Sequence, residues 1–155
     1  MRKRKPKLRV IAPDPRYGDP LVTQFVNNMM MAGKKSTTFR VYYDAMDIVK
    51  ERTKQDEHAV WKKALNNIMP QVEVRSRRIG GATFQIPVEI RAKRKVSIGM
   101  KWLVNFARKR SGKGMAEKLA AEIIAGSKGE GSAVKRKEDT HKMAESNRAF
   151  AHFRV

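Results

Sequence analysis

The chain has 155 residues, enough for one domain with a hydrophobic core, and its 35 Lys and Arg against 15 Asp and Glu give a net charge of +20. Such an excess of positive charge opposes a compact state through self-repulsion and favours a polyanionic partner. The absence of cysteine excludes disulfides, Cys-based zinc sites and a thiol nucleophile, and is typical of a reducing cytoplasm.

Residues 1–15 form a basic N-terminal arm. Six of its first nine residues are Lys or Arg, and no acid precedes Asp14. This run predicts a segment that is disordered when free and binds phosphate when docked, although a nuclear localisation signal has the same composition. Its apolar stretch is too short for a signal peptide, and no run in the chain approaches the ~20 residues of a membrane span, so no membrane partner is expected.

Residues 16–71 show three helical patterns. The first begins at Asp19-Pro20, an N-cap followed by proline at the first helical position, and stops at Gly33. The second runs over about 36–53. The third, capped by Gln55-Asp56, ends at Pro70, and both have apolar residues at helical spacing.

Two apolar features of this region are interpreted as core. Trp61 lies on the apolar face of the third helical pattern. The run Met29-Met30-Met31 is typical of flexible core filling rather than of a binding groove.

In residues 72–90 the apolar period changes to two. Alternating runs on either side of Gly80-Gly81 predict a β-hairpin. A two-residue loop would place Val74 opposite Pro87, whereas a three-residue loop would place Val74 opposite Val88 and gather the apolar side chains on one face. We expect the second register, because a one-residue slip moves every side chain to the other face.

This hairpin is expected to be an arm. A lone two-stranded ribbon is marginal in water, and this one carries Arg75, Arg77 and Arg78 near its tip. The combination predicts an arm that docks on an anionic partner, the alternative being a solvated hairpin that folds back on its own domain.

Residues 91–149 show three more helical patterns, the first of them preceded by a basic collar at 91–95. Breaks at 111–114 and 126–131 separate them, and a tail, 150–155, follows. The expected fold is mainly α (α+β): one domain, a six-helix bundle with an inserted two-stranded antiparallel β-hairpin arm between the third and fourth helices.

Catalytic constellations are not predicted. The three histidines, His58, His141 and His152, are scattered, and none pairs with another at the spacing that gathers metal ligands on one helical face. The glycine-rich stretch 126–131 lacks the Lys that a phosphate-binding P-loop needs, and its match to the G-x-x-G clamp of KH domains lacks the surrounding strands. We therefore expect no enzyme, no cofactor and no metal.

Basic clusters recur at the junctions between the expected elements. They are the N-terminal arm, Lys34-Lys35, 75–78, 91–95, 108–113 and 135–137. A single cluster is equally typical of a solvated face, but six with little acid to balance them indicate a shared anionic surface. Two alternatives stay open here: a histone-like binder of any nucleic acid, and a nuclease using carboxylates such as Glu73 or Glu89.

The order of motifs is similar to that of the bacterial small-subunit ribosomal protein seven family over essentially the whole chain. The motifs that carry the resemblance are the basic arm, Tyr17-Gly18-Asp19, Gly33-Lys34-Lys35, the stretch PQVEVRSRRIGGATFQIPVE at 70–89, Trp102-Leu103 and ESNRAFAHF at 145–153. The resemblance implies six helices plus a β-ribbon, and a cytoplasmic ribosomal protein that binds 16S rRNA in its 3′ major domain and nucleates assembly of the 30S head. It also implies a place near the decoding region and exit (E) site, contacts with E-site tRNA and the mRNA path, and small-subunit proteins nine and eleven as neighbours.

The resemblance further implies which residues make these contacts. The rRNA contacts are expected at Arg2, Lys3, Arg4, Lys5, Lys7, Lys34, Lys35, Arg75, Arg77, Arg78, Arg94, Lys95, Arg108, Lys109, Arg110, Lys113, Lys135 and Lys137. The tRNA-facing residues are expected at the hairpin tip and near the end of the last helix: Ile79, Gly80, Gly81, Ala82, Thr83, Asn147 and Arg148.

Overall fold

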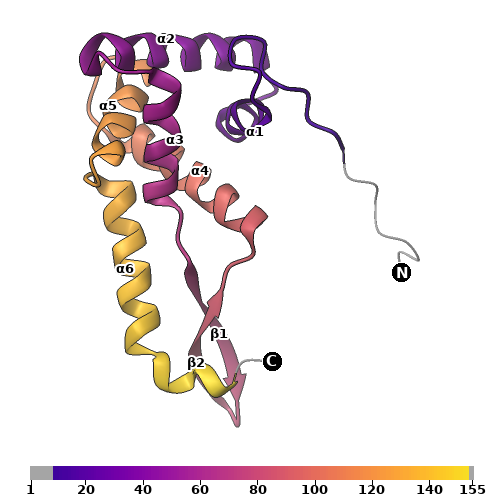
Figure 1. Cartoon of the computed structure of the whole chain (residues 1–155). Coiled ribbons are helices and arrows are strands. Elements are labelled where there is room, and N and C mark those ends of the chain that lie inside the picture. The colour runs from indigo at the N-terminus through magenta and orange to yellow at the C-terminus, as the bar shows by residue number, and fades with distance from the viewer. Residues whose placement is uncertain (1–8, 154–155) are drawn as a thin grey trace.

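The computed structural model of the protein describes residues 9–153, so the predicted contacts at Arg2, Lys3, Arg4, Lys5 and Lys7 lie outside the described residues. The elements in chain order are α1 (Pro20–Met29), α2 (Lys35–Thr53), α3 (Glu57–Ile68), β1 (Val72–Ile79), β2 (Ala82–Glu89), α4 (Ala92–Lys109), α5 (Met115–Ser127), α6 (Ser132–Ser146) and the 3-10 helix η1 (Arg148–Phe153). The predicted class is confirmed: the fold is mainly helical, with an antiparallel hairpin between α3 and α4 (Figure 1).

Helix α5 is the centre of the helical body. It packs against α2, α3 and α4, and its Leu119, Ala120 and Ile123 are fully buried. The predicted core position of Trp61 is confirmed, since its side chain is inaccessible. The methionine run divides instead: Met29 is buried, whereas Met31 is 66% exposed.

The helix starts follow the capping residues of the sequence. The Asp19 carboxylate accepts the N–H of Leu21 (2.8 Å) at α1, and Asp56 accepts the N–H of His58 (3.2 Å) at α3. Helix α1 ends at Met29, four residues before Gly33: Met30 already leaves the helical conformation (ψ 138°), and Ala32 and Gly33 then adopt positive φ in a tight turn that leads into α2.

Two boundaries in the C-terminal half differ from the prediction. The basic collar 91–95 does not precede α4: Arg91 is its N-cap and Ala92 already begins the helix. Helix α6 stops at Ser146, and the predicted tail is largely the 3-10 helix η1.

The predicted hairpin register is wrong. The strands pair Val72 with Glu89 and Val74 with Pro87 around a two-residue loop. Gly80 (φ +56°) and Gly81 (φ +90°) supply the two positive φ angles of a type I′ loop, whose twist matches that of the strands. The turn residues therefore decide the register, and Phe84, Ile86 and Val88 of β2 lie opposite charged residues of β1.

The arm is supported by the C-terminal segment. Helix α6 runs along the hairpin and η1 packs against β2, while the hairpin extends away from the helical body (Figure 1). Phe84 of β2 contacts the rings of Phe150 (5.2 Å between centroids) and Phe153 (5.9 Å). The hairpin is thus an arm that projects from the helical body and does not fold back on it, and the expectation of a lone ribbon is corrected, because α6 and η1 pack against the strands.

Candidate nucleic-acid interface

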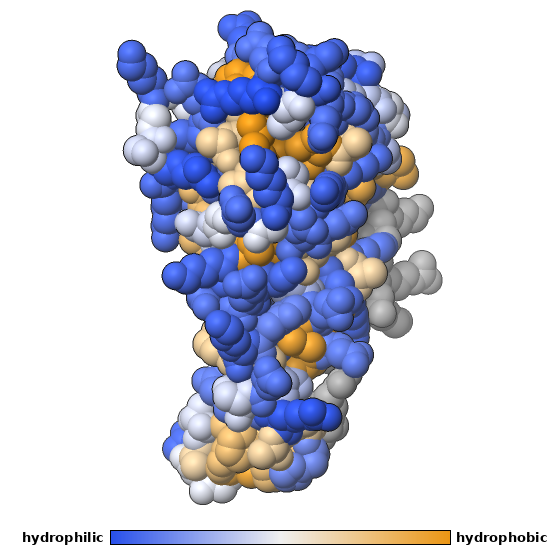
Figure 2. All heavy atoms as spheres, turned by 60° about the vertical axis from the view of Figure 1, so that its left-hand side comes forward, coloured by the Kyte–Doolittle hydropathy of each residue, from blue (hydrophilic) through white to orange (hydrophobic). Residues whose placement is uncertain are grey.

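The face shown in Figure 2 is mostly hydrophilic, with apolar patches both on the helical body and at the far end, where the hairpin and η1 lie. The predicted cations come from separate elements. Lys34 and Lys35 are exposed at the start of α2, Lys109 is exposed at the end of α4, Lys113 is exposed in the loop that follows, and Lys135 is exposed on α6. These cations are therefore accessible to a partner from several elements.

At the base of the arm, two predicted contact residues share one carboxylate. Glu73 of β1 accepts from Arg75 (Nη2–Oε1, 2.6 Å) and from Arg94 of α4 (Nη2–Oε2, 2.9 Å). Burial favours a raised pKa for Glu73, but the hydrogen bonds from Arg94 and Arg75 outweigh it and hold the pKa below its ordinary value. Since two guanidinium groups meet one carboxylate, the cluster keeps a net positive charge.

The same contacts explain how α4 tolerates a basic first turn. Cations at a helix N-terminus oppose the helix dipole, and the Glu73 carboxylate supplies the compensating negative charge. The side chains of Arg75 and Arg94 are 58% and 55% exposed, so their remaining N–H groups face solvent and can bind phosphate.

The tip of the arm and the end of α6 come together. Arg77 donates to the main-chain carbonyl of Phe153 (2.9 Å), and Gly80 to Thr83 are exposed. Asn147 is the C-cap of α6 and Arg148 opens η1, which packs against β2. The two groups predicted to face tRNA, distant in sequence, therefore share one end of the molecule (Figure 1).

At the C-terminal end of α4, two predicted contact arginines also have structural roles. Arg108, in the last turn of α4, donates to the main-chain carbonyl of Met29 (2.9 Å), which ties α4 to the end of α1. Arg110, the C-cap of α4, forms an ion pair with Glu122 of α5, whose side chain is fully buried. The end of α4 is thus held to the body by residues expected to bind RNA.

Sequence reasoning missed the role of Glu122. Its Oε1 accepts the N–H of Ala133 (3.0 Å), so a carboxylate from α5 satisfies the N-terminus of α6, whose own N-cap residue is Gly131. A β-carbon on Gly131, which has φ +96°, would lie 3.3 Å from that oxygen. The available signal was an acid at a core-facing position, one residue before Ile123.

Sequence reasoning also missed a hydrogen-bonded cluster at the C-terminal end of the N-terminal arm (residues 1–15). Asp14, 2% exposed, accepts the N–H of Tyr17 (2.9 Å) and the hydroxyl of Tyr43 (2.7 Å). Burial, together with the hydrogen bond to Asp14, raises the pKa of Tyr43 to about 12. The Tyr17 hydroxyl donates to Glu57 of α3 (3.1 Å), so the point at which the arm leaves the body is anchored to two helices.

Glu73 was one of the two carboxylates considered for a nuclease. Glu73 is engaged by two arginines, and within residues 9–153 no group of three or more His, Asp or Glu could hold a metal ion. The helices of the same part of the chain include none that is both long and apolar enough to cross a membrane.

This arrangement defines a small basic α+β protein that presents cations from several elements around a supported arm, the class that associates with polyanions. Comparison with known proteins narrows the class. The model of the family described as "Ribosomal protein S7p/S5e" matches residues 1–148.

Individual relatives of the chain carry the name of a small-subunit ribosomal protein. The chain is 58% identical to the small ribosomal subunit protein uS7 of Cytophaga hutchinsonii over 154 residues, with 99% of each chain covered. It is 61% identical over 158 residues to the protein of that name in Flavobacterium psychrophilum and 62% identical over 157 residues to that of Porphyromonas gingivalis, again with 99% of each covered. The chain belongs to this family of small-subunit ribosomal proteins, and its role is structural rather than enzymatic.

Proposed function

We propose that the protein is a primary binder of 16S rRNA, that it binds the 3′ major domain, and that it nucleates assembly of the head of the 30S subunit. Membership of the S7p/S5e family and a net charge of +20 support this role. The mechanism is charge and shape: cations and main-chain donors hold junctions of folded RNA, whose deep major groove side chains do not read.

The observation that carries the proposal is the cation cluster at the base of the arm. Arg75 and Arg94 are fixed in position by Glu73 yet remain more than half exposed, so phosphate contacts there cost little side-chain entropy. The cluster joins β1 to α4, and RNA bound across it would contact arm and body together.

A finer proposal concerns the far end of the arm. The hairpin tip and the Asn147–Arg148 segment share one end of the molecule, which supports a surface that faces E-site tRNA and the mRNA path near the decoding region. Small-subunit proteins nine and eleven are the proposed protein neighbours, in the cytoplasmic ribosome.

Footprinting on a transcript of the 16S 3′ major domain tests the rRNA proposal. The double variant Arg75→Ala/Arg78→Ala is expected to lose a distinct subset of the protections that the wild type gives. Lys50→Ala/Arg52→Ala, which removes two exposed cations from the end of α2, is the charge-matched control and keeps that subset. Unchanged protection with the Arg75/Arg78 variant would contradict the assignment of the arm.

A further inference from the structure

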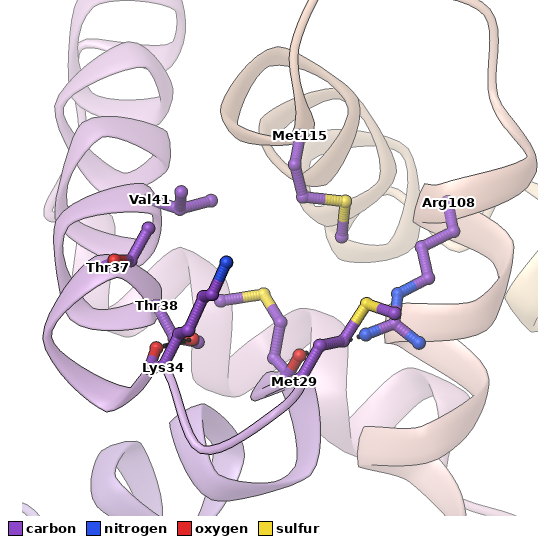
Figure 3. A pocket seen from close by; sticks show the side chains of 8 residues that line it. Met29, Lys34, Thr37, Thr38, Val41, Arg108 and Met115 are labelled. Carbon is purple, nitrogen blue, oxygen red and sulfur yellow. Dashed lines mark hydrogen bonds between the residues drawn. The ribbon is translucent and has the colours of Figure 1, made fainter.

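An open pocket of about 340 Å³ lies where the end of α1, the start of α2, the end of α4 and the start of α5 meet (Figure 3). Its walls are mostly apolar and include Met29, Met31, Met115 and Val41. Its volume is at the lower end of the ~300–1,000 Å³ range of small-molecule sites, which suits one nucleoside and excludes a duplex.

Two cations of different elements border this pocket. Lys34 precedes α2, and Arg108 lies in the last turn of α4, on the opposite side of the opening (Figure 3). Arg108 uses Nη2 to bond the Met29 carbonyl, which fixes the guanidinium and leaves its other N–H groups available. Among the described residues that line the pocket none is acidic, so its charge is complementary to an anion.

The lining also has the chemistry of a platform for an aromatic ring. Methionine sulfur is polarisable and makes favourable contacts with π systems, and unbranched side chains adapt to a flat ring. Met31 is 66% exposed, an apolar area that a bound ring would cover. The combination of an apolar floor with cations at the rim matches a nucleotide, whose base is a flat ring and whose phosphate is an anion.

We propose that this pocket binds one unpaired, unstacked nucleotide of the partner RNA, with the base among Met29, Met31 and Met115 and a flanking phosphate at Lys34 and Arg108. The inference rests on the proposed rRNA binding and adds to it a site for a single base. The pocket reads little sequence, because stacking on methionine accepts every base.

The first test observes the wild-type protein with ¹³C-labelled methionine methyl groups, bound to the 16S 3′ major domain transcript. The methyl signals of Met31 and Met115 are expected to shift upfield, because a stacked base places them over its ring. The signal of Met100, fully buried in the core, reports the intact fold and keeps its position.

The second test fills the pocket. Thr37 lines it from an exposed position on α2, so Thr37→Trp places an indole in the opening without changing charge or core packing. We expect about a tenfold loss of rRNA affinity, within the range that one stacked base contributes. Ser36→Trp adds the same bulk at the neighbouring exposed position outside the pocket and is expected to change affinity less than twofold.

The outcomes separate the two proposals. A wild type that shows no preference for the rRNA over random duplex overturns the proposed function and the pocket with it. A wild type that binds specifically, while Met31 and Met115 keep their free positions and Thr37→Trp binds as tightly, overturns the pocket alone. The second result is also expected if the pocket binds an apolar side chain of a protein partner instead of a base.

Discussion

At the scale of the residue, ion pairs within the chain fix the positions of several arginines that are expected to bind RNA. Arg75, Arg94 and Arg110 each have an acidic partner within the chain, so their guanidinium groups are positioned before any RNA arrives. Positioning of this kind lowers the entropy that binding must overcome. Substitution of such an arginine therefore changes local structure as well as charge, and experiments on them need stability measurements.

Glu122 is the residue whose loss is expected to be most destabilising among these partners. In Glu122→Gln an amide replaces the carboxylate that accepts from Arg110 and from the Ala133 N–H, so α6 loses its anionic cap. We expect the free energy of unfolding to fall by about 2 kcal/mol, less than the ~3–5 kcal/mol for a fully buried pair because Arg110 is a third exposed. Urea denaturation measures this, with Glu117→Gln, an exposed acid in the first turn of α5, as control; equal losses in the two variants would contradict the assignment.

His141 makes stability depend on pH. Its Nε2 accepts the N–H of Gln71 (3.1 Å) and joins α6 to the root of the arm, a bond that only the neutral ring can make. Burial, with a contribution from Lys137, lowers its pKa in the folded state below the ordinary value of 6.5. Protonation therefore favours the unfolded chain, and the stability that neutral His141 supplies is complete above about pH 6.5 and is lost as pH falls through the folded pKa.

The comparison of variants isolates this effect. Between about pH 7 and pH 5, the free energy of unfolding should fall more steeply in the wild type than in His141→Gln, which does not titrate. The same slope in the two proteins would refute the role of His141.

At the scale of the element, the hairpin shows what the sequence specifies and what it leaves open. Alternation and Gly80-Gly81 predicted the strands, and Asp19-Pro20 and Asp56 predicted two helix starts, because these signals are local. The register was mispredicted because a uniform apolar face was weighted above the turn. The structure instead covers Phe84 with Phe150 and Phe153, a contact between residues more than sixty positions apart that no local pattern reveals.

The candidate site, like the hairpin, could be predicted from the sequence only in part. Composition and charge runs predicted the basic residues, but the partners that fix them, such as Glu73 for Arg94 and Glu122 for Arg110, depend on packing between elements. The pocket bordered by Lys34 and Arg108 likewise forms only when four helix ends meet.

Shortening the hairpin tests the role of its tip. Deleting Arg78, Ile79, Ala82 and Thr83, which form two successive pairs, moves the Gly80-Gly81 loop between Arg77 and Phe84 and keeps the register and hydrogen-bonding pattern of every remaining pair. Circular dichroism should be unchanged, since the packing of Phe84 against η1 stays, while retention of E-site tRNA on ribosomes that carry the variant should weaken. Deleting Ile79 alone is the control for register, and full tRNA retention by the four-residue deletion would contradict a tip contact.

At the scale of the whole molecule, a helical body centred on α5 carries an arm that α6 and η1 hold in place (Figure 1). The net charge of +20 gives affinity for any polyanion, but charge alone gives no preference among RNAs. The proposed function requires more: cations fixed on separate elements must match the phosphates of one folded RNA. Specificity, not affinity, therefore separates a primary rRNA binder from a general basic protein.

A competition titration measures that difference most directly. The protein is titrated with labelled 16S 3′ major domain at several salt concentrations, with and without an excess of random double-stranded RNA. We expect binding that persists against the competitor, with a salt slope that corresponds to several neutralised phosphates. Equal loss of binding to any duplex would contradict the account and leave a basic protein without a preferred RNA.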